Sequence, residues 1–405
     1  MSSASWRARD LTARQLADEM SSYFSDMANE LNISYDRFIR TVDPDHYAAS
    51  QAIWKAMEAK GDLYLDRYEG WYSVRDEAFY EEKELTEGEG GVKLSPQGTP
   101  VEWTAEETWF FRLSKYQQPL LDFYAANPDF IRPERSRNEV VKFVEGGLID
   151  LSVSRTSFDW GVPVPGSPGH VMYVWVDALT NYLTGIGYPD EASALFRKFW
   201  PADLHVVGKD IIRFHTVYWP AFLMSAGIEV QHRVFAHGFL TVDGQKMSKS
   251  LGNVIDPFAL VDEFGPDAIR YFFLREVSFG NDGDYSNEKL TNRVNADLAN
   301  NLGNLAQRSL SMINKNCDAK IPTPGALTAE DEALIAEVSE ALDAAQKAMD
   351  EQLVHDATGA IVAALSSANN YFAGQAPWAL KKTDPDRMAT VLYVTADTVR
   401  RLTIP

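Results

Sequence analysis

The 405-residue sequence contains a single cysteine, Cys317, which excludes an intramolecular disulfide and any zinc site built from cysteine pairs. It has no apolar run near the roughly 20 residues that cross a bilayer, and Met1 to Asp10 lacks the hydrophobic stretch of a secretory signal. Positive charge is scarce, because 38 Lys and Arg oppose 58 Asp and Glu, for a net charge of −20. We therefore expect a cytoplasmic protein that meets a polyanion only through local basic patches. The candidate patches are Lys246/Lys249, Arg293/Arg308 and Arg400/Arg401.

The spacing of apolar residues divides the chain into three regions. Residues 1–137 begin with an amphipathic helix within 11–40, whose apolar stripe runs from Leu16 through Phe24 to Leu31, and continue as a mixed aromatic segment. In residues 138–266, strands predicted at 151–154, 171–176, 204–207 and 234–236 alternate with helices at 177–185 and 210–227, the second kinked or shortened at Pro220. This alternation predicts an α/β fold with a mostly parallel sheet and ligands at the carboxyl ends of its strands.

Residues 267–405 show helical stripes and predict a bundle. The stripe residues are Leu298, Leu302, Leu305 and Leu310 in the first helix, Leu334, Val338, Leu342, Ala345 and Met349 in the second, and Ile361, Leu365, Ala368 and Phe372 in the third. Thr328, with Asp331 three residues later, predicts a capping box at the start of the second helix.

The most informative motif is Lys-Met-Ser-Lys-Ser at residues 246–250. Lys246 and Lys249 lie three residues apart, have the hydroxyl groups of Ser248 and Ser250 beside them and are followed by Gly252, so they predict a mobile cationic loop. Stabilising the charge on a polyphosphate is the main way in which nucleotidyl transfer is accelerated, so the loop indicates ATP chemistry. The alternative is an ordinary solvated Lys/Ser loop.

Residues 237–250 resemble the second signature of class I aminoacyl-tRNA synthetases. Residues 173–178 (Tyr-Val-Trp-Val-Asp-Ala) and 208–215 (Gly-Lys-Asp-Ile-Ile-Arg-Phe-His) resemble the methionyl family in particular, and residues 304–308 and 375–378 resemble its anticodon-binding helices. The resemblance covers nearly the whole chain. It implies an incomplete Rossmann-type catalytic domain at 138–266, an inserted connective domain within 1–137 and a helical anticodon-binding domain at 267–405.

The resemblance also implies a reaction. The methionine carboxylate attacks the α-phosphorus of ATP, pyrophosphate leaves, and the acyl group passes to tRNA(Met); no protein nucleophile is needed. We expect Mg2+ to accompany ATP, and we expect no zinc, because paired cysteines that many relatives use are missing. The expected partners are methionine and tRNA(Met), without a membrane, and the expected state is a monomer.

Two departures from the family pattern lead to a competing hypothesis. None of the seven histidines has the spacing of the family's first signature, His-x-Gly-His, and residues 400–405 fall inside an expected bundle helix. We therefore expect truncation at both ends. The competing hypothesis is a catalytically impaired remnant that retains only tRNA binding. A synthetase for another aliphatic amino acid fits less well, because the aromatic and anticodon residues point to methionine.

For the amino-acid pocket, Trp175 and Tyr182 lie seven residues apart and line one cavity if their helix begins early. Aromatic walls suit a flexible thioether, although core packing would use the same residues. The methionine-binding residues that the resemblance implies are Trp175, Ala178, Tyr182, Ile211, Phe214 and His215.

For ATP, the resemblance implies Gly208, Asp210, His237, Leu240, Lys246, Ser248 and Lys249. Gly208 lets a ligand approach the backbone, and Asp210 is placed to accept from ribose hydroxyls. Arg155 matches a family arginine near the reacting carboxylate and joins Lys246 and Lys249 as a catalytic candidate; a structural ion pair is the alternative.

For the anticodon, Asn304 and Arg308 are four residues apart and share one helix face. Trp378, after Pro377, is placed to stack an unpaired base while the Asn and Arg side chains read base edges. The alternative for Trp378 is partly buried packing.

Overall fold

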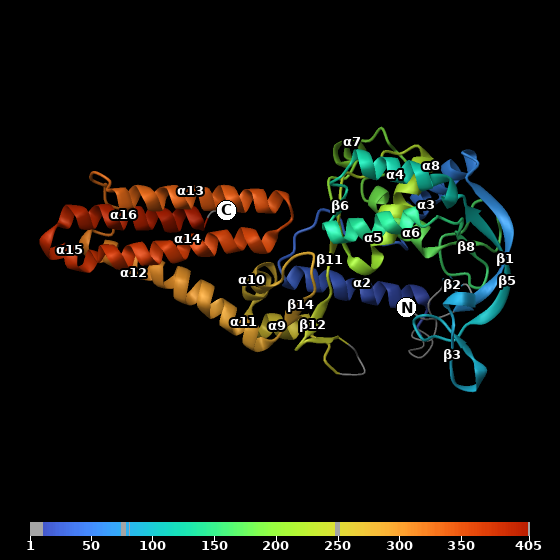
Figure 1. Cartoon of the computed structure of the whole chain (residues 1–405), viewed down its shortest axis with the longest axis horizontal. Coiled ribbons are helices and arrows are strands. Elements are labelled where there is room, and N and C mark those ends of the chain that lie inside the picture. Colours follow the sequence, from blue (N-terminus) through green and yellow to red (C-terminus); the bar gives the residue numbers. More distant parts are fainter. Residues whose placement is uncertain (1–10, 74–77, 81, 248–251, 404–405) are drawn as a thin grey trace. The chain divides into compact units, whose positions relative to one another are not determined.

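The computed structural model describes residues 11–73, 78–80, 82–247 and 252–403. The chain divides into two compact units (Figure 1). The first unit holds the described residues up to Ala28 together with Ser34–Ala236, and the second holds Asn29–Ile33 and the described residues from His237 onward. This division falls at 236/237, whereas the domain boundaries at 137/138 and 266/267 remain predictions.

The longest strands of the first unit form an antiparallel hairpin. β1 (Leu63–Ser73) pairs with β5 (Glu102–Phe111), with Leu63 opposite Phe111 (Figure 1). Their sheet has the order β2-β1-β5-β7, where β2 is Ala78–Tyr80 and β7 is Leu151–Ser152. Between β1 and β5 the chain also forms η1 (Glu82–Glu84), β3 (Thr86–Glu87), η2 (Glu89–Gly91) and β4 (Lys93–Leu94).

The predicted parallel sheet has three strands in the order β10 (His205–Gly208), β11 (Val234–His237) and β6 (Ile131–Arg132). β6 and β11 are parallel, with Ile131 opposite Val234. β6 precedes the predicted boundary at residue 138, so the sheet takes a strand from the region assigned to the insertion. The β10 and β11 predictions are confirmed within one residue.

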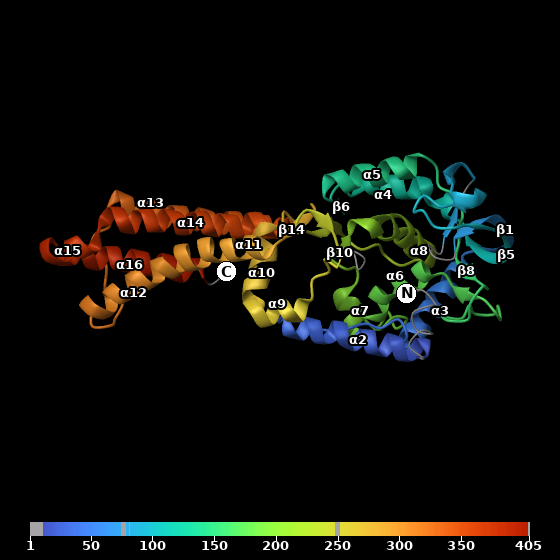
Figure 2. The same cartoon turned by 90° about the horizontal axis from the view of Figure 1, so that it is seen from below.

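Helices pack around these sheets and complete one apolar core. They are α3 (Pro44–Ala59), η3 (Leu113–Tyr116), α4 (Gln117–Ala126), α5 (Glu134–Glu145), α6 (Val174–Thr184), α7 (Ala194–Phe199) and α8 (Trp219–Ala226). α4 and α5 lie side by side (Figure 2). Trp54, Phe111, Trp219 and Phe222 are fully buried, and burial of such large rings is the main stabilising contribution.

Two element predictions near the candidate pocket need correction. The strand predicted over 171–176 ends at Met172 as β9 (Val171–Met172), and α6 begins at Val174 rather than at residue 177. A short apolar run fits a strand and a buried helix equally well, and here the helical face that includes Val176 packs into the core. The helix predicted over 210–227 consists of η4 (Lys209–Ile211), the π turn η5 (Phe214–Tyr218) and α8, so its irregularity precedes Pro220.

The predicted amphipathic helix is confirmed as α2 (Ala13–Glu30), which ends ten residues before the predicted limit. Leu16 is buried, but Phe24 of the same predicted stripe is about half exposed. The loop after α2 begins because Asn32 adopts a positive φ that a helix cannot accommodate.

The second unit begins with a small sheet and continues as helices. β12 (Leu240–Val242) pairs antiparallel with β13 (Gln245–Lys246) and parallel with β14 (Gly283–Tyr285). The helices are α9 (Pro257–Phe264), α10 (Pro266–Glu276), α11 (Asn287–Arg293), the π segment η6 (Val294–Gly303), α12 (Asn304–Asn316), α13 (Ala329–Asp350), α14 (Val354–Gln375), α15 (Pro377–Thr383) and α16 (Pro385–Leu402). α13, α14 and α16 run alongside one another (Figure 1).

The bundle confirms most of the predicted stripes. Leu305, Val338, Leu365 and Phe372 are buried in one core, and the Thr328/Asp331 capping box is present. Leu310 and Met349 are about half exposed instead. Leu310 lies five residues after Leu305, about 140° around the helix, so the buried positions fall on Ser309 and Ile313.

Within the described ranges, none of the helices is both long enough and apolar enough to cross a membrane.

Candidate functional site

The structure brings the six candidate methionine-binding residues together in the first unit. Because α6 begins at Val174, it carries Trp175, Ala178 and Tyr182 on adjoining turns. η4 and η5 supply Ile211, Phe214 and His215. The rings of Trp175 and Phe214 stack with their centroids 3.7 Å apart and their planes 8° apart. The two walls that the sequence predicted therefore meet.

A hydrogen bond joins the polar groups of this cluster. The Tyr182 hydroxyl lies 2.6 Å from Nε2 of His215, and Nδ1 of His215 lies 3.0 Å from the Ile211 carbonyl oxygen. Because a carbonyl only accepts, Nδ1 carries the proton, Nε2 accepts, and Tyr182 donates. Burial lowers the pKa of His215 and raises the pKa of Tyr182 to about 12, so both side chains are neutral near pH 7.

Sequence reasoning missed two rings behind Tyr182. His205 stacks on Tyr182 with centroids 3.9 Å apart and is only 4% exposed. Burial, with a smaller effect of His215, lowers the pKa of His205 to about 3. Trp219 is fully buried, with its ring centroid 6.4 Å from that of Tyr182. The signal for His205 was its position in β10, where it shares the inward face with Val207.

Sequence reasoning also missed the residue that fixes α6. Nε2 of His46 lies 2.6 Å from Oδ1 of Asp177 in the first turn of α6, and Nδ1 lies 2.9 Å from Oγ1 of Thr184 in the last turn. His46 is fully buried on α3. It therefore ties down both ends of the helix that carries the candidate pocket. More than 130 residues separate these partners along the chain, and no local pattern marks the pairing.

Arg155, predicted to hold a carboxylate or phosphate, lies buried on β8 (Ser154–Arg155). Its Nη1 donates to Oγ of Ser152 at 2.8 Å and to the carbonyl oxygen of Ser154 at 2.7 Å. Its guanidinium also lies 4.7 Å from the ring centroid of Tyr173. These contacts fix one edge of the guanidinium to hydroxyl and carbonyl oxygens.

The candidate ATP residues fall in both units. In the first, Gly208 ends β10, and Asp210 follows it on η4 with its side chain exposed. In the second, His237 stacks with Phe279 at 6.3 Å, and Leu240 begins β12. Gly238 packs so closely that an added Cβ would lie 2.2 Å from the Asn281 backbone, so no other residue fits without movement.

Lys246 ends β13, with Nζ 5.8 Å from the ring centroid of Phe239. Ser248 and Lys249 lie outside the described residues. The β12–β13 hairpin that carries Lys246 is held by Asp284, a residue that sequence reasoning missed. Oδ1 of Asp284 accepts from the Gly244 backbone at 2.7 Å, and a hydrogen bond from Lys289 leads the contacts that lower the pKa of Asp284 to about 2.

Arg308 and Trp378, two of the candidate anticodon residues, meet on the bundle of the second unit. Arg308 on α12 places its guanidinium 5.5 Å from the ring centroid of Trp378 and 5.1 Å from that of Phe372. Trp378 is 50% exposed at the start of α15, and its edge contacts Phe372. Asn304 lies exposed one turn before Arg308, with its amide donating to the Asn300 carbonyl oxygen at 3.1 Å. Trp378 is thus available for stacking as well as packed along one edge.

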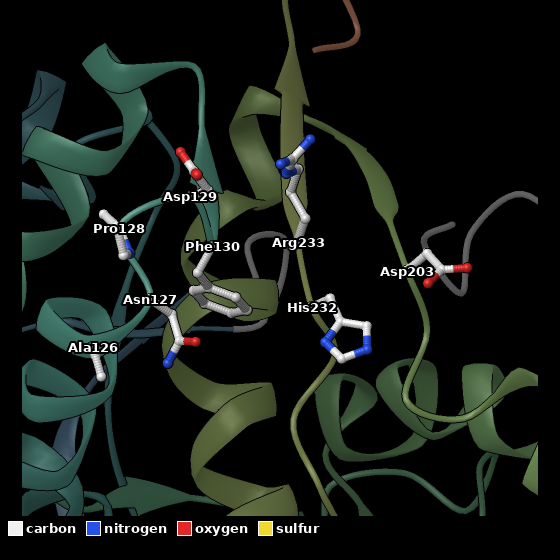
Figure 3. Close-up of a pocket in the computed structure, with 8 residues that line it drawn as sticks. All are labelled: Ala126, Asn127, Pro128, Asp129, Phe130, Asp203, His232 and Arg233. Atoms are coloured by element: carbon white, nitrogen blue, oxygen red, sulfur yellow. The ribbon is translucent and has the colours of Figure 1, made fainter. Parts of the chain in front are cut away.

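Two cavities lie away from these residues. One of about 270 Å³ lies in the first unit (Figure 3) and one of about 360 Å³ in the second. The first is lined by Asp129 and Phe130 just before β6, Asp203 just before β10, and His232 and Arg233 just before β11. It therefore lies at the amino ends of the strands, opposite the edge where ligands of parallel sheets bind. Neither cavity includes a candidate site residue.

Within the described part of the chain, no three His, Cys, Asp or Glu side chains gather closely enough to hold a metal ion. The expectation that the protein binds no zinc stays a prediction.

Comparison with known proteins gives the same assignment from two family models. Residues 3–310 match the family model described as tRNA synthetases class I (M). Residues 321–403 match the model described as the anticodon binding domain of methionyl tRNA ligase. Together the two matches follow the order of catalytic and helical regions that the sequence predicted.

Individual relatives are similar along nearly the whole chain. The methionine–tRNA ligase of Brucella suis biovar 1 (strain 1330) is 61% identical over 398 residues, covering 98% of this chain and 77% of the relative. The enzyme of Mycobacterium tuberculosis (strain ATCC 25618 / H37Rv) is 59% identical over 390 residues, covering 95% of this chain and 75% of the relative.

Among solved structures, the Mycobacterium tuberculosis methionyl-tRNA synthetase in complex with methionyl-adenylate superposes with a TM-score of 0.94 at 57% identity, covering 98% of this chain and 79% of that one. Its apo form gives a TM-score of 0.89 at 56% identity, covering 96% of this chain and 77% of that one. From the sequence matches, the fold and the superposition, the chain belongs to the methionyl-tRNA synthetase family of class I tRNA synthetases.

Proposed function

We propose that this chain recognises methionine, ATP and tRNA(Met) as a methionine–tRNA ligase, forming methionyl-adenylate and passing the methionyl group to tRNA(Met). The observation that carries the proposal is the aromatic cluster of α6 and η5, in which Trp175 stacks on Phe214 and Tyr182 donates to His215. Supporting it, a solved relative with a TM-score of 0.94 is described in complex with methionyl-adenylate.

The cluster suits an uncharged, polarisable side chain. A thioether interacts favourably with aromatic ring edges and brings no charge to be desolvated. Because His215 is kept neutral by burial and accepts from Tyr182, the pocket presents no cation to the side chain. We assign side-chain recognition to Trp175, Ala178, Tyr182, Ile211, Phe214 and His215.

Positioning and charge stabilisation would then drive the chemistry. We assign contacts with ATP to Gly208, Asp210, His237, Leu240, Lys246, Ser248 and Lys249, and contact with the reacting carboxylate or α-phosphate to Arg155. Mg2+ would accompany ATP and neutralise the charge of its phosphates.

Recognition of tRNA(Met) would rest on stacking as much as on charge, because the chain carries a net charge of −20. The half-exposed Trp378 supplies the stacking surface, and Arg308 and Asn304 supply donors for base edges.

Calorimetric titration of the 405-residue protein with methionine tests the proposal. Tyr182→Phe removes the donor to His215, and Trp175→Ala removes the stacked wall; each should weaken methionine binding by roughly tenfold or more. His232→Gln is the control, since His232 is exposed in the same unit and outside the cluster, and it should bind methionine as the wild type does. Equal affinity for methionine and leucine, or no effect of either pocket variant, would contradict the assignment.

A further inference from the structure

We propose that Thr108, on the antiparallel β5 strand, is a positioning residue for Arg155, acting through the hydroxyl of Ser152. The proposal rests on the function proposed above, in which Arg155 contacts the reacting carboxylate or phosphate. Thr108 itself touches no substrate. Its effect would be to set the direction from which the guanidinium approaches the ligand.

A chain of short contacts links the two residues. Oγ1 of Thr108 lies 2.8 Å from Oγ of Ser152, and Oγ of Ser152 lies 2.8 Å from Nη1 of Arg155. Oγ1 of Thr108 also lies 2.8 Å from the carbonyl oxygen of Ser154, to which the same Nη1 donates at 2.7 Å. Thr108 thus contacts the two oxygens to which Nη1 of Arg155 makes its short hydrogen bonds.

The proton inventory fixes the direction of each hydrogen bond. Thr108 has one hydroxyl proton, and the Ser154 carbonyl oxygen can only accept, so this proton goes to Ser154. The contact between Ser152 and Thr108 then requires Ser152 to donate its own proton to Oγ1 of Thr108. With that proton engaged, the lone pairs of the Ser152 hydroxyl are directed to Nη1 of Arg155.

Burial makes this arrangement stiff. Thr108, Ser152, Ser154 and Arg155 are all buried, so water does not replace a lost partner freely. If Thr108 becomes valine, the Ser152 proton loses its acceptor, and rotation of the hydroxyl would aim that proton at a cation. Arg155 would then shift along the face of Tyr173, which lies 4.7 Å from its guanidinium.

The same network ties the candidate reacting centre to the long hairpin. Thr108 lies on β5, opposite Asp66 of β1, and Ser152 lies on β7, opposite Phe110 of β5. The antiparallel sheet therefore supplies the hydroxyl groups of Thr108 and Ser152 that orient an arginine on the separate strand β8. This gives the hairpin a part in catalysis that its sequence does not indicate.

The test compares two ligands that differ at the group Arg155 would contact. A non-hydrolysable methionyl-adenylate analogue with a sulfamoyl linkage retains the acyl group and a stand-in for the phosphate, whereas methioninol has the methionine side chain but no carboxylate. Calorimetry on the 405-residue protein would measure the dissociation constant of each. Thr108→Val should raise the dissociation constant of the analogue roughly tenfold and change that of methioninol by less than twofold.

Three further variants separate positioning from general damage. Thr108→Ser retains the hydroxyl and should bind both ligands as the wild type does. Thr104→Val makes the same change on the same strand, where the hydroxyl contacts only the neighbouring Glu102 carbonyl oxygen at 3.4 Å in the described contacts, and should leave both constants unchanged. Arg155→Lys should also weaken binding of the analogue selectively, and by a larger factor than Thr108→Val does, because lysine lacks the planar donor pair.

Equal weakening of both ligands by Thr108→Val would make Thr108 a structural residue and overturn the proposal, as would unchanged binding of both. If the wild type binds methioninol and the analogue but Thr108→Val has no selective effect, only this inference fails. If the wild type binds neither ligand, the proposed function itself is wrong.

Discussion

The Tyr182 hydroxyl lies 2.6 Å from Nε2 of His215, and the opposite edge of that imidazole is held by the Ile211 carbonyl oxygen. His205 stacks on the other side of Tyr182. The result is a row of three neutral rings, in which the protons of Tyr182 and His215 are directed to acceptors within the first unit. Each imidazole is more acidic in the folded state than in the unfolded chain, so the two histidines couple the stability of the fold to pH.

The first prediction concerns stability at mildly acidic pH. His205 has a folded pKa of about 3, well below the roughly 6.5 of an unfolded histidine, so the unfolded state binds more protons as pH falls. The contribution of neutral His205 to the unfolding free energy is fully present above pH 6.5 and is lost as pH falls from there toward 3. Between pH 7 and pH 5 the loss should be about 2 kcal/mol.

Urea unfolding of the wild type and of His205→Phe at pH 7 and pH 5 measures this loss. Phenylalanine keeps a stacking ring but has no titrating group. The unfolding free energy of His205→Phe should therefore fall by about 2 kcal/mol less than that of the wild type between pH 7 and pH 5. His232→Gln, which changes an exposed imidazole, should keep the wild-type slope. Identical slopes for wild type and His205→Phe would show that His205 is not buried as described.

The second prediction concerns a buried carboxylate in the helical bundle. Asp331 accepts from the Thr328 backbone and from Arg387, whose Nη2 lies 2.8 Å from Oδ1. Burial alone raises the pKa of Asp331, but the bonds from Arg387 and Tyr371 bring it down to about 2. Asp331→Asn leaves the largely buried Arg387 without its counter-charge, so the unfolding free energy should fall by roughly 3 kcal/mol.

Chemical unfolding of the second unit at pH 7, with Asp350→Asn at the last residue of the same helix as the control, checks this value. Because the folded pKa is depressed, the Asp331 contribution is present above about pH 4 and is lost as pH falls toward 2. A change below 1 kcal/mol would mean that water replaces Arg387 readily.

The sequence predicted elements where residue spacing is strictly local. The capping box at Thr328, the stripe ending at Phe372 and the strand before Gly208 all follow from neighbours within a few residues. The candidate pocket residues could be named from the resemblance to the methionyl family, because the spacing of Trp175 and Tyr182 brings them together only if their helix begins early, as α6 does. Pairings between residues far apart in the sequence leave no local pattern, so the contacts of His46 with Asp177 and of Thr108 with Ser152 could not be predicted. Nor could the run 171–176 be divided between strand and helix.

The third prediction concerns anticodon recognition. Trp378 is 50% exposed beside Arg308, so its free face can stack an unpaired base. Trp378→Ala should weaken binding of the methionine anticodon stem-loop by roughly 1–3 kcal/mol and leave weak binding of unrelated stem-loops nearly unchanged. Trp103→Ala is the matched control, since Trp103 is 57% exposed in the first unit. Equal losses for both RNAs would make Trp378 a packing residue.

The last prediction concerns methionine-dependent pyrophosphate exchange by the 405-residue chain. None of its seven histidines forms a His-x-Gly-His signature, so the ATP phosphates would lack that set of donors. Removing one preorganised donor typically costs about 10²–10³ in rate, so exchange should be at least about 100-fold slower than for the Mycobacterium tuberculosis enzyme. Methioninol binding by the same preparation would show that the pocket is folded.

Lys246→Ala should lower any residual exchange further, because Lys246 is the cationic-loop lysine that the structure describes. Exchange at a rate comparable with that relative would show that the lysine loop and Arg155 suffice.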